Sequence, residues 1–329
     1  MSITVLTERE LRDCVKLDRE AVDAVENAFT ALDRGGVQMP PVVHLAIPDH
    51  NGEMDAKTAY VPGFDSFALK VSTGFFENPA LGLPSLSGLM NLFDAKTGRV
   101  RAVLLDNGYL TDVRTAAAGA VAAAHLARRG AKTAAVLGTG LQARLQVEAL
   151  SIVRPIEAVR VWGRDEAKAQ NLAASLRDEL SVSAEACGRA QDAVRGADVV
   201  VTTTPAAEPI LLAEWLEPGT HVTAMGSDSG DKNELDPQAL ARATRVIVDS
   251  RAQCLRLGEL RSAVETGALS EDAPVTELGA ITAGRARGRE DDGDVTVCDL
   301  TGTGVQDTAI ATVAYRRATA AGYGVAIDT

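Results

Sequence analysis

Residues 134–143 read AAVLGTGLQA, a run of small apolar residues that ends in a glycine-rich turn. Gly138, Gly140 and Ala143 have the G-x-G-x-x-A spacing of a dinucleotide-binding turn between a strand and a helix. The first glycine permits the tight turn, the second lets the backbone approach a pyrophosphate, and the alanine allows close packing of helix on strand. A glycine-rich turn without a nucleotide is the alternative, but the segments around this turn favour a dinucleotide site at the helix N-terminus.

Short apolar runs alternate with amphipathic segments on the C-terminal side of this turn. The expected helices cover residues 141–153 and 166–180, and the expected strands are AVRVWGR, DVVVTTT, HVTAMGS and RVIVDS, at residues 158–164, 198–204, 221–227 and 245–250. This alternation predicts a parallel sheet with helices on both of its faces. We therefore expect an α/β fold with a doubly wound Rossmann domain over residues 116–304.

The N-terminal part of the chain predicts a second, different domain. After an expected helix at residues 20–33, the stretch MPPVVHLAIP leads into the short runs TAYVPG, FALKVSTGFF, LSGLMNLFD and VRAVLLDN, at residues 58–63, 67–76, 86–94 and 100–107. Turn residues such as Asn51-Gly52 and Pro62-Gly63 separate these runs. The pattern is typical of a mainly antiparallel α+β domain, which we expect over residues 1–115.

Two helices are expected to connect these parts. An Ala-rich segment from Leu110 to Gly130 reads as one long helix that joins the domains, with Arg128 and Arg129 complementing the dipole of its last turn. The tail at residues 305–329 reads as a further helix that returns to the first domain.

Composition excludes several classes of protein. The 329 residues favour two domains, and a net charge of −12, from 45 acidic and 33 basic residues that are scattered along the chain, argues against a nucleic-acid partner. No run reaches the roughly 18 apolar residues of a membrane span, and the start lacks a signal-peptide pattern, so we expect a cytoplasmic protein without a membrane partner. The four cysteines are widely spaced, which predicts neither disulfides nor a metal site.

The end of the second expected strand bears on the choice of dinucleotide. An acidic residue there would bond the ribose 2′-hydroxyl of NAD, whereas an arginine accommodates the 2′-phosphate of NADP. Arg164 occupies this position and favours NADP, and Asp165 after it keeps NAD open. The candidate cofactor-binding residues are Gly138, Thr139, Gly140, Leu141, Gln142, Arg164, Thr202, Thr203, Thr204 and Thr115.

Six stretches spread over nearly the whole chain resemble the ornithine cyclodeaminase and μ-crystallin family: MPPVVHL, FALKVS, LTDVRTAAAGAVAA, LGTGLQA, GADVVVTTT and MGSDSGDKNELDP. They are most similar to its ectoine-utilisation cyclodeaminase-like and iminosuccinate reductase branch. The resemblance implies a substrate and dimerisation domain, a Rossmann domain, an active site in the cleft, and bound NAD or NADP used in amino-acid or imine chemistry. It also implies at least a homodimer.

The same resemblance implies three catalytic residues: Lys70, the carboxylate-binding Arg114, and Asp228. Alternation along residues 67–72 puts Lys70 on the face opposite the large apolar residues, and an ammonium there can protonate an imine. The planar fork of Arg114 suits a carboxylate, and Asp228 follows a strand end, where ligands of open α/β sheets gather. Without the resemblance, a solvated lysine, an ion pair of Arg114 with Asp112, and a turn aspartate are the alternatives.

Two departures from the family's pattern bear on the substrate. Val42 stands where related enzymes place a second arginine, and the segment around Lys57 lacks the acidic residue that ornithine cyclodeaminases use for the distal amine. A buried ammonium without a partner is costly, so ornithine is disfavoured. His44 either lines the cleft or is structural.

The preferred interpretation is hydride transfer between nicotinamide C4 and the Cα of a small imino or amino acid, with Asp228 bonding the substrate nitrogen. A cyclodeaminase that recycles its cofactor is the first alternative, and a non-enzymatic, crystallin-like binding protein is the second. Iminosuccinate and ectoine-derived diamino acids are the first candidate substrates, by resemblance alone.

Overall fold

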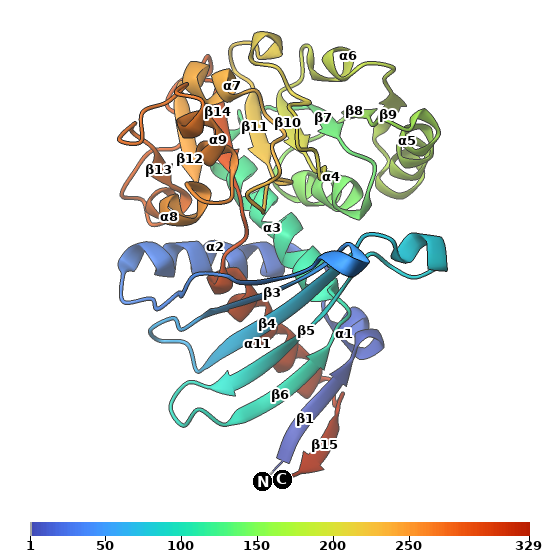
Figure 1. Ribbon diagram of the computed structural model, residues 1–329, viewed down its shortest axis with the longest axis vertical. Coiled ribbons are helices and arrows are strands. Elements are labelled where there is room, and N and C mark those ends of the chain that lie inside the picture. The colour runs from blue at the N-terminus through green and yellow to red at the C-terminus, as the bar shows by residue number, and fades with distance from the viewer. Residues whose placement is uncertain (1) are drawn as a thin grey trace. The chain divides into compact units, whose positions relative to one another are not determined.

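The computed structural model describes residues 2–329 and divides into two compact units. One unit consists of Met1–Arg114 and Thr303–Thr329, and the other of Thr115–Gly302. Each unit is built on its own sheet (Figure 1). The expected fold class is confirmed, because one sheet is parallel and of the Rossmann type and the other is mainly antiparallel.

The first unit contains a seven-stranded sheet in the order β15-β1-β6-β5-β4-β3-β2, in which only β1 and β6 run parallel. Its strands are β1 Ser2–Thr7, β2 Val43–Ile47, β3 Gly52–Ala59, β4 Ser66–Phe75, β5 Leu86–Asp94, β6 Val100–Leu105 and β15 Val325–Asp328. Its helices are α1 Glu8–Cys14, α2 Arg19–Arg34, η1 Pro48–His50, η2 Asn78–Leu81, α11 Gly304–Ala320 and the first residues of α3 Tyr109–Leu126.

The C-terminal helix α11 packs on one face of this sheet (Figure 1). A Cβ on Gly304 would lie 2.4 Å from the carbonyl oxygen of Thr58, so the helix begins in direct backbone contact with β3. The Thr308 hydroxyl lies 2.9 Å from the carbonyl of Ala59 and accepts the N–H of Ala68 at 3.1 Å. The tail helix therefore belongs to the first unit and covers the face on which the even-numbered side chains of β4 are buried.

The second unit contains an eight-stranded, all-parallel sheet in the order β13-β12-β14-β11-β10-β7-β8-β9. Its strands are β7 Thr133–Leu137, β8 Ala158–Trp162, β9 Ser183–Ala186, β10 Val199–Thr202, β11 His221–Ala224, β12 Arg245–Val248, β13 Thr276–Glu277 and β14 Thr296–Asp299. Its helices are α4 Leu141–Val153, α5 Glu166–Leu180, α6 Ala190–Val194, η3 Ala213–Trp215, α7 Pro237–Arg242, α8 Arg251–Cys254, α9 Glu259–Glu265 and α10 Leu278–Thr282.

Strand order reverses at β7, which has β8 on one side and β10 on the other. The reversal matters because ligands of open α/β sheets bind beyond the carboxyl ends of the strands at such a switch point. The glycine-rich turn follows β7 directly, so the fold places it at this position.

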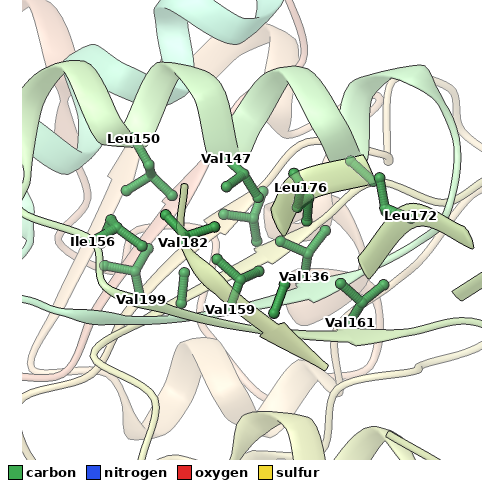
Figure 2. Close-up of a cluster of buried hydrophobic side chains, with 14 of the residues drawn as sticks. Val136, Val147, Leu150, Ile156, Val159, Val161, Leu172, Leu176, Val182 and Val199 are labelled. Atoms are coloured by element: carbon green, nitrogen blue, oxygen red, sulfur yellow. The ribbon is translucent and has the colours of Figure 1, made fainter. Parts of the chain in front are cut away.

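An apolar cluster holds α4 and α5 on one face of the parallel sheet (Figure 2). Each fully buried aliphatic side chain of this kind stabilises the fold by about 1.5 to 3 kcal/mol. The cluster includes Val136, Val147, Leu150, Ile156, Val159, Val161, Leu172, Leu176, Val182 and Val199. These branched side chains fix the position of the turn between β7 and α4.

Three local expectations are wrong. The tail was expected as a helix to Thr329, but α11 ends at Ala320, and Val325–Asp328 form strand β15, because they pair with the edge of the sheet at β1. The long helix ends at Leu126 rather than Gly130, because Arg154 donates to the carbonyls of Ala124 and Ala127, and Arg289 donates to that of Leu126. The strand expected over TAYVPG lies earlier, as β3, because its hairpin with β2 closes at the turn that ends in Gly52.

Among residues 2–329, no helix is both long and apolar enough to cross a bilayer. The thiols of Cys14, Cys187, Cys254 and Cys298 are free in the structure.

Candidate active site

Lys70 lies in the middle of β4 on the face that α11 covers, with 3% of its surface exposed. Its Nζ is 3.9 Å from Oδ2 of Asp307, a fully buried residue of α11. A buried ammonium requires a compensating charge. Asp307 supplies that charge, so Lys70 is held inside the first unit and is not a solvated strand lysine.

Arg114, which is 5% exposed, pairs with the other oxygen of the same carboxylate. Its Nε lies 3.0 Å from Asp307 Oδ1, and its Nη1 donates to Gln306 Oε1 at 3.2 Å. The ion pair of Arg114 is therefore with Asp307, and not with Asp112 as in the alternative expected from the sequence. One buried aspartate thus brings together two of the three residues that the family resemblance implies.

Lys57 and Asp106 extend this cluster, which the sequence reasoning did not anticipate. Lys57 is the cross-strand partner of Lys70 and is 7% exposed, so the two stems lie side by side, about 5 Å apart at Cβ. Burial raises the pKa of Asp106 to about 6. The N–H of Leu110, which donates to this carboxyl group at 2.8 Å, and the nearby ammonium of Lys70 each lower the pKa and offset part of that rise. The cluster thus brings together the cationic side chains of Lys57, Lys70 and Arg114 with the carboxyl groups of Asp106 and Asp307.

His44 lies outside this cluster. It pairs with Asp55 across β2 and β3 at 2.8 Å, and half of its side chain is exposed. This contact is consistent with a structural histidine, and a role for His44 in lining the cleft stays a prediction.

The glycine-rich turn of the second unit has the geometry that a dinucleotide needs. Gly138 has a φ of +136°, and a Cβ there would lie 2.4 Å from Thr203 Oγ1, so only glycine fits. Gly140 is the N-cap of α4, and a Cβ there would meet nothing within 4 Å. Since glycine carries no side chain to cap this helix, its first amides remain suited to a phosphate. Ala143 is fully buried against the sheet, as the spacing predicted.

Four further candidate cofactor residues lie in the glycine-rich turn, in α4 and in α3. A Cβ on Gly163 would meet Thr139 Cγ2 at 2.5 Å, so the turns after β7 and β8 pack together. Leu141 is 51% exposed, and Thr115 accepts the side-chain N–H of Gln146 at its carbonyl, at 3.1 Å. The same Gln146 amide lies 3.4 Å from Oε1 of Gln142. Its bond to Thr115 connects α4 to the part of α3 that belongs to the second unit.

Arg164 is exposed at the turn between β8 and α5. Asp165 after it is the N-cap of α5 and accepts the N–H of Lys168 at 3.1 Å. One oxygen of the carboxylate that would favour NAD is thus used in the helix cap, while the guanidinium of Arg164 is exposed to solvent.

Thr202 ends β10, and Thr203 and Thr204 follow it at the carboxyl edge of the sheet, where the N–H of Thr203 bonds the carbonyl of Leu137 at 2.9 Å. Asp228 follows β11 on the same edge, is exposed, and pairs with Lys232 at 2.6 Å. The three implied catalytic residues are therefore divided, with Lys70 and Arg114 in the first unit and Asp228 in the second.

Comparisons with known proteins agree over the whole chain. The model of the ornithine cyclodeaminase/mu-crystallin family matches residues 2–322. A putative dehydrogenase of Rhizobium meliloti is 57% identical over 325 residues, which cover 99% of this chain and 98% of that protein. An archaeal alanine dehydrogenase dimer with bound NAD has a TM-score of 0.93 at 35% identity, covering 100% of this chain and 99% of that one. The iminosuccinate reductase of Paracoccus denitrificans, in complex with NAD+, has a TM-score of 0.92 at 33% identity and full coverage of both chains.

Proposed function

The chain belongs to the ornithine cyclodeaminase/mu-crystallin family, and from this premise we propose that it is an NAD(P)H-dependent reductase of a small imino acid. The observation that carries the proposal is the shared pairing of Lys70 and Arg114 with Asp307 inside the first unit. It brings an ammonium and a guanidinium together in one buried cluster, which supports a proton donor and a carboxylate ligand as their roles. Similarity to an iminosuccinate reductase and an alanine dehydrogenase supports the same chemistry.

In this proposal the first unit binds the substrate. Arg114 binds the substrate carboxylate with the guanidinium plane that Asp307 and Gln306 fix. The Lys70 ammonium donates its proton to the imine nitrogen, and Asp307 holds that ammonium in place. Asp228 accepts a hydrogen bond from the substrate nitrogen and stabilises its positive charge.

The second unit holds the dinucleotide. The amides that open α4 and the bare backbone at Gly140 fit a pyrophosphate, and Thr202 to Thr204 border the nicotinamide side at the carboxyl edge of the sheet. When bound, NAD(P)H supplies the hydride for the substrate Cα. We propose NADP as the preferred form, because Arg164 is exposed at the end of β8 whereas Asp165 caps α5, and NAD, which both similar structures contain, as the alternative.

The charges around Lys70 favour an imino acid without a second amine. Lys57 and Lys70 are neighbours across β3 and β4, and both are buried. A distal substrate ammonium, as in ornithine, would add a further cation to this cluster. Iminosuccinate, with two carboxylates, complements it better, and ectoine-derived diamino acids complement it less well.

A homodimer completes the proposal. The strand register puts the exposed side chains of Val43, Leu45 and Val325 on the same sheet face as Leu69 and Val71, opposite α11. A broad apolar face of this kind marks an interface, and the similar alanine dehydrogenase is a dimer. We propose that a second copy of the chain covers it. Light scattering should give a dimer for the native protein and a monomer for Val71→Glu, and a native monomer would rule this out.

The test of the activity is cofactor oxidation with a panel of substrates. NADPH and NADH are each supplied with oxaloacetate, pyruvate or another oxo acid plus ammonia or methylamine, and with cyclic ketimines. Oxidation of one cofactor molecule for each amino acid formed is expected. Ammonia release from ornithine or another diamino acid without net cofactor change would instead identify a cyclodeaminase, and binding without turnover of any substrate would favour the crystallin-like alternative.

A further inference from the structure

Glu234, in the loop that follows β11, is fully buried and accepts four hydrogen bonds. Its Oε1 accepts the backbone N–H of Thr204 at 2.5 Å and the hydroxyl of the same residue at 2.8 Å. Its Oε2 accepts the Thr202 hydroxyl at 2.7 Å and the backbone N–H of Gly226 at 2.8 Å. A single carboxylate therefore links the end of β10 to the start of the loop after β11.

The two linked segments are packed backbone to backbone. A Cβ on Gly226 would lie 2.2 Å from the carbonyl oxygen of Thr204 and 2.5 Å from Cδ of Glu234. Any side chain at position 226 would push these segments apart. The absence of a side chain at Gly226 and the carboxylate of Glu234 together set the spacing between the two segments.

A second buried carboxylate, that of Glu259, anchors the same loop at Ser227 and at Glu234 and Leu235. Glu259 of α9 accepts the Ser227 hydroxyl at 2.5 Å, the N–H of Glu234 at 2.8 Å and the N–H of Leu235 at 3.1 Å. Ser227 and Glu234 flank Asp228 along the chain. The exposed Asp228 is thus carried by a segment whose ends are both fixed to buried acids.

We propose that Glu234 is a positioning residue that fixes the Thr202–Thr204 segment and the Gly226–Asp228 segment relative to each other. The consequence for catalysis rests on the proposed function, in which the Thr202–Thr204 segment borders the cofactor and Asp228 contacts the substrate nitrogen. The backbone N–H of Thr204 and that of Gly226 each require an acceptor, one on each oxygen of Glu234, and a carboxyl group can accept at both oxygens.

Protonation leaves this arrangement intact, whereas replacement by glutamine does not. Burial raises the pKa of Glu234 to about 7, and the neighbouring Glu259 carboxylate contributes in the same direction. A protonated Glu234 can donate to the Thr202 or Thr204 hydroxyl, which rotates to accept, so both backbone bonds persist. The amide of a glutamine would direct a second N–H at the backbone N–H of Thr204 or Gly226, and one of these donors would lose its acceptor.

The first experiment measures amide hydrogen exchange by mass spectrometry in the native chain and in Glu234→Gln. Exchange at residues 202–206 and 226–230 is expected to rise by roughly tenfold, the equivalent of one lost backbone bond. Glu185→Gln is the matched control, since Glu185 is 72% exposed and pairs with Arg160 at 3.7 Å. Unchanged exchange in both segments of Glu234→Gln would overturn the proposal whatever reaction the enzyme catalyses.

The second experiment is a double-mutant cycle with Asp228→Asn. Glu234→Gln alone is expected to lower kcat by roughly 10- to 100-fold, the effect of a small misplacement, and to lower it less than about 3-fold further when Asp228 is already changed. If the two substitutions instead lower kcat independently, so that their fold-losses multiply in the double variant, Glu234 does not act through Asp228 and has a merely structural role. Full activity of Asp228→Asn would remove Asp228 from the proposed function, while the exchange result would still decide the role of Glu234.

Should Glu234→Gln not fold, Thr202→Val takes its place, because it deletes the hydroxyl that donates to Glu234 Oε2. Faster exchange at residues 226–230 as well as at residues 202–206 is then expected, since the same oxygen accepts the N–H of Gly226. Unchanged exchange at residues 226–230 would overturn the link through Glu234.

Discussion

Asp307 Oδ1 lies 3.0 Å from Arg114 Nε, and both side chains are almost completely buried. The other oxygen of the same carboxylate faces Lys70, so the aspartate compensates two cations at once. We expect Asp307→Asn to reduce the free energy of unfolding by about 3 to 5 kcal/mol, because two buried cations lose the opposite charge of Asp307. Urea unfolding checks this, with the exposed Asp328→Asn as control. A loss below about 1 kcal/mol, as for a surface pair, would contradict the assignment.

Lys70→Ala is expected to lower kcat by at least roughly 100-fold, the usual contribution of a positioned acid, and to leave the Kd of the cofactor unchanged. The cofactor candidates lie in the other unit, so binding and catalysis should separate. Steady-state kinetics and quenching of protein fluorescence by NAD(P)H measure the two quantities. Lys96→Ala, in the exposed turn between β5 and β6, is the control, and native turnover by Lys70→Ala would remove Lys70 from the mechanism.

The two glycines of the dinucleotide turn should fail in different ways. Gly138→Ala forces an L-residue to a φ of +136° and into Thr203, so we expect a loss of stability of about 1 to 3 kcal/mol together with lost cofactor binding. Gly140→Ala meets no atom within 4 Å and should unfold at the native temperature, yet bind the cofactor at least roughly tenfold more weakly. Calorimetry and a cofactor titration distinguish them. Native affinity in Gly140→Ala would place the pyrophosphate elsewhere.

Arg164→Ala is expected to raise the KM for NADPH by roughly tenfold or more and to leave that for NADH within about twofold, because a 2′-phosphate loses its guanidinium partner. Asp165→Ala is the complementary variant, and it should cost helix stability through the lost cap of α5. Equal effects of Arg164→Ala on both cofactors would show that this residue does not select between them.

Asp106 gives the protein a pH-dependent term in its stability. Burial raises its pKa from 3.8 to about 6, so the native state binds the proton more tightly than the unfolded state, and this stabilisation is lost as the pH rises through that window. Asp106→Asn can still accept the N–H of Leu110. Relative to the native protein, it should gain stability between about pH 4 and pH 6, by at most about 3 kcal/mol. Denaturation at both pH values measures the difference, and a difference that does not change with pH would be inconsistent with this burial effect.

The local sequence pattern was enough to predict the fold class and the glycine-rich turn. Strand alternation, helix periodicity and the requirement for glycine at position 138 each depend on a few consecutive residues. The position of Lys70 on its strand face follows from the same period of two. Asp307 could not be paired with Lys70 and Arg114 from the sequence, because the pairing depends on how the tail helix packs on a distant strand. The only signal was the expectation that the tail returns to the first domain.

The parts that sequence reasoning missed depend on long-range contacts. The end of α3 is set by Arg154 and Arg289, which lie far along the chain and bond its last carbonyls. Glu234 stands in the motif MGSDSGDKNELDP, but its contacts with Thr204 and Gly226 follow only from the packing of two separate segments on the same carboxylate. Short edge strands such as β13 and β15 carry too few residues to produce a periodic signal.

The most direct test of net imine reduction follows the hydride itself. NADPH deuterated at C4, or NADH if that is the cofactor used, is supplied with the best imino-acid substrate, and the amino-acid product is examined by mass spectrometry. We predict one deuterium at Cα of each product molecule and one cofactor molecule oxidised for each deuterium transferred. Product that forms without net oxidation of the labelled cofactor would contradict the reductase and identify a cyclodeaminase that returns its hydride.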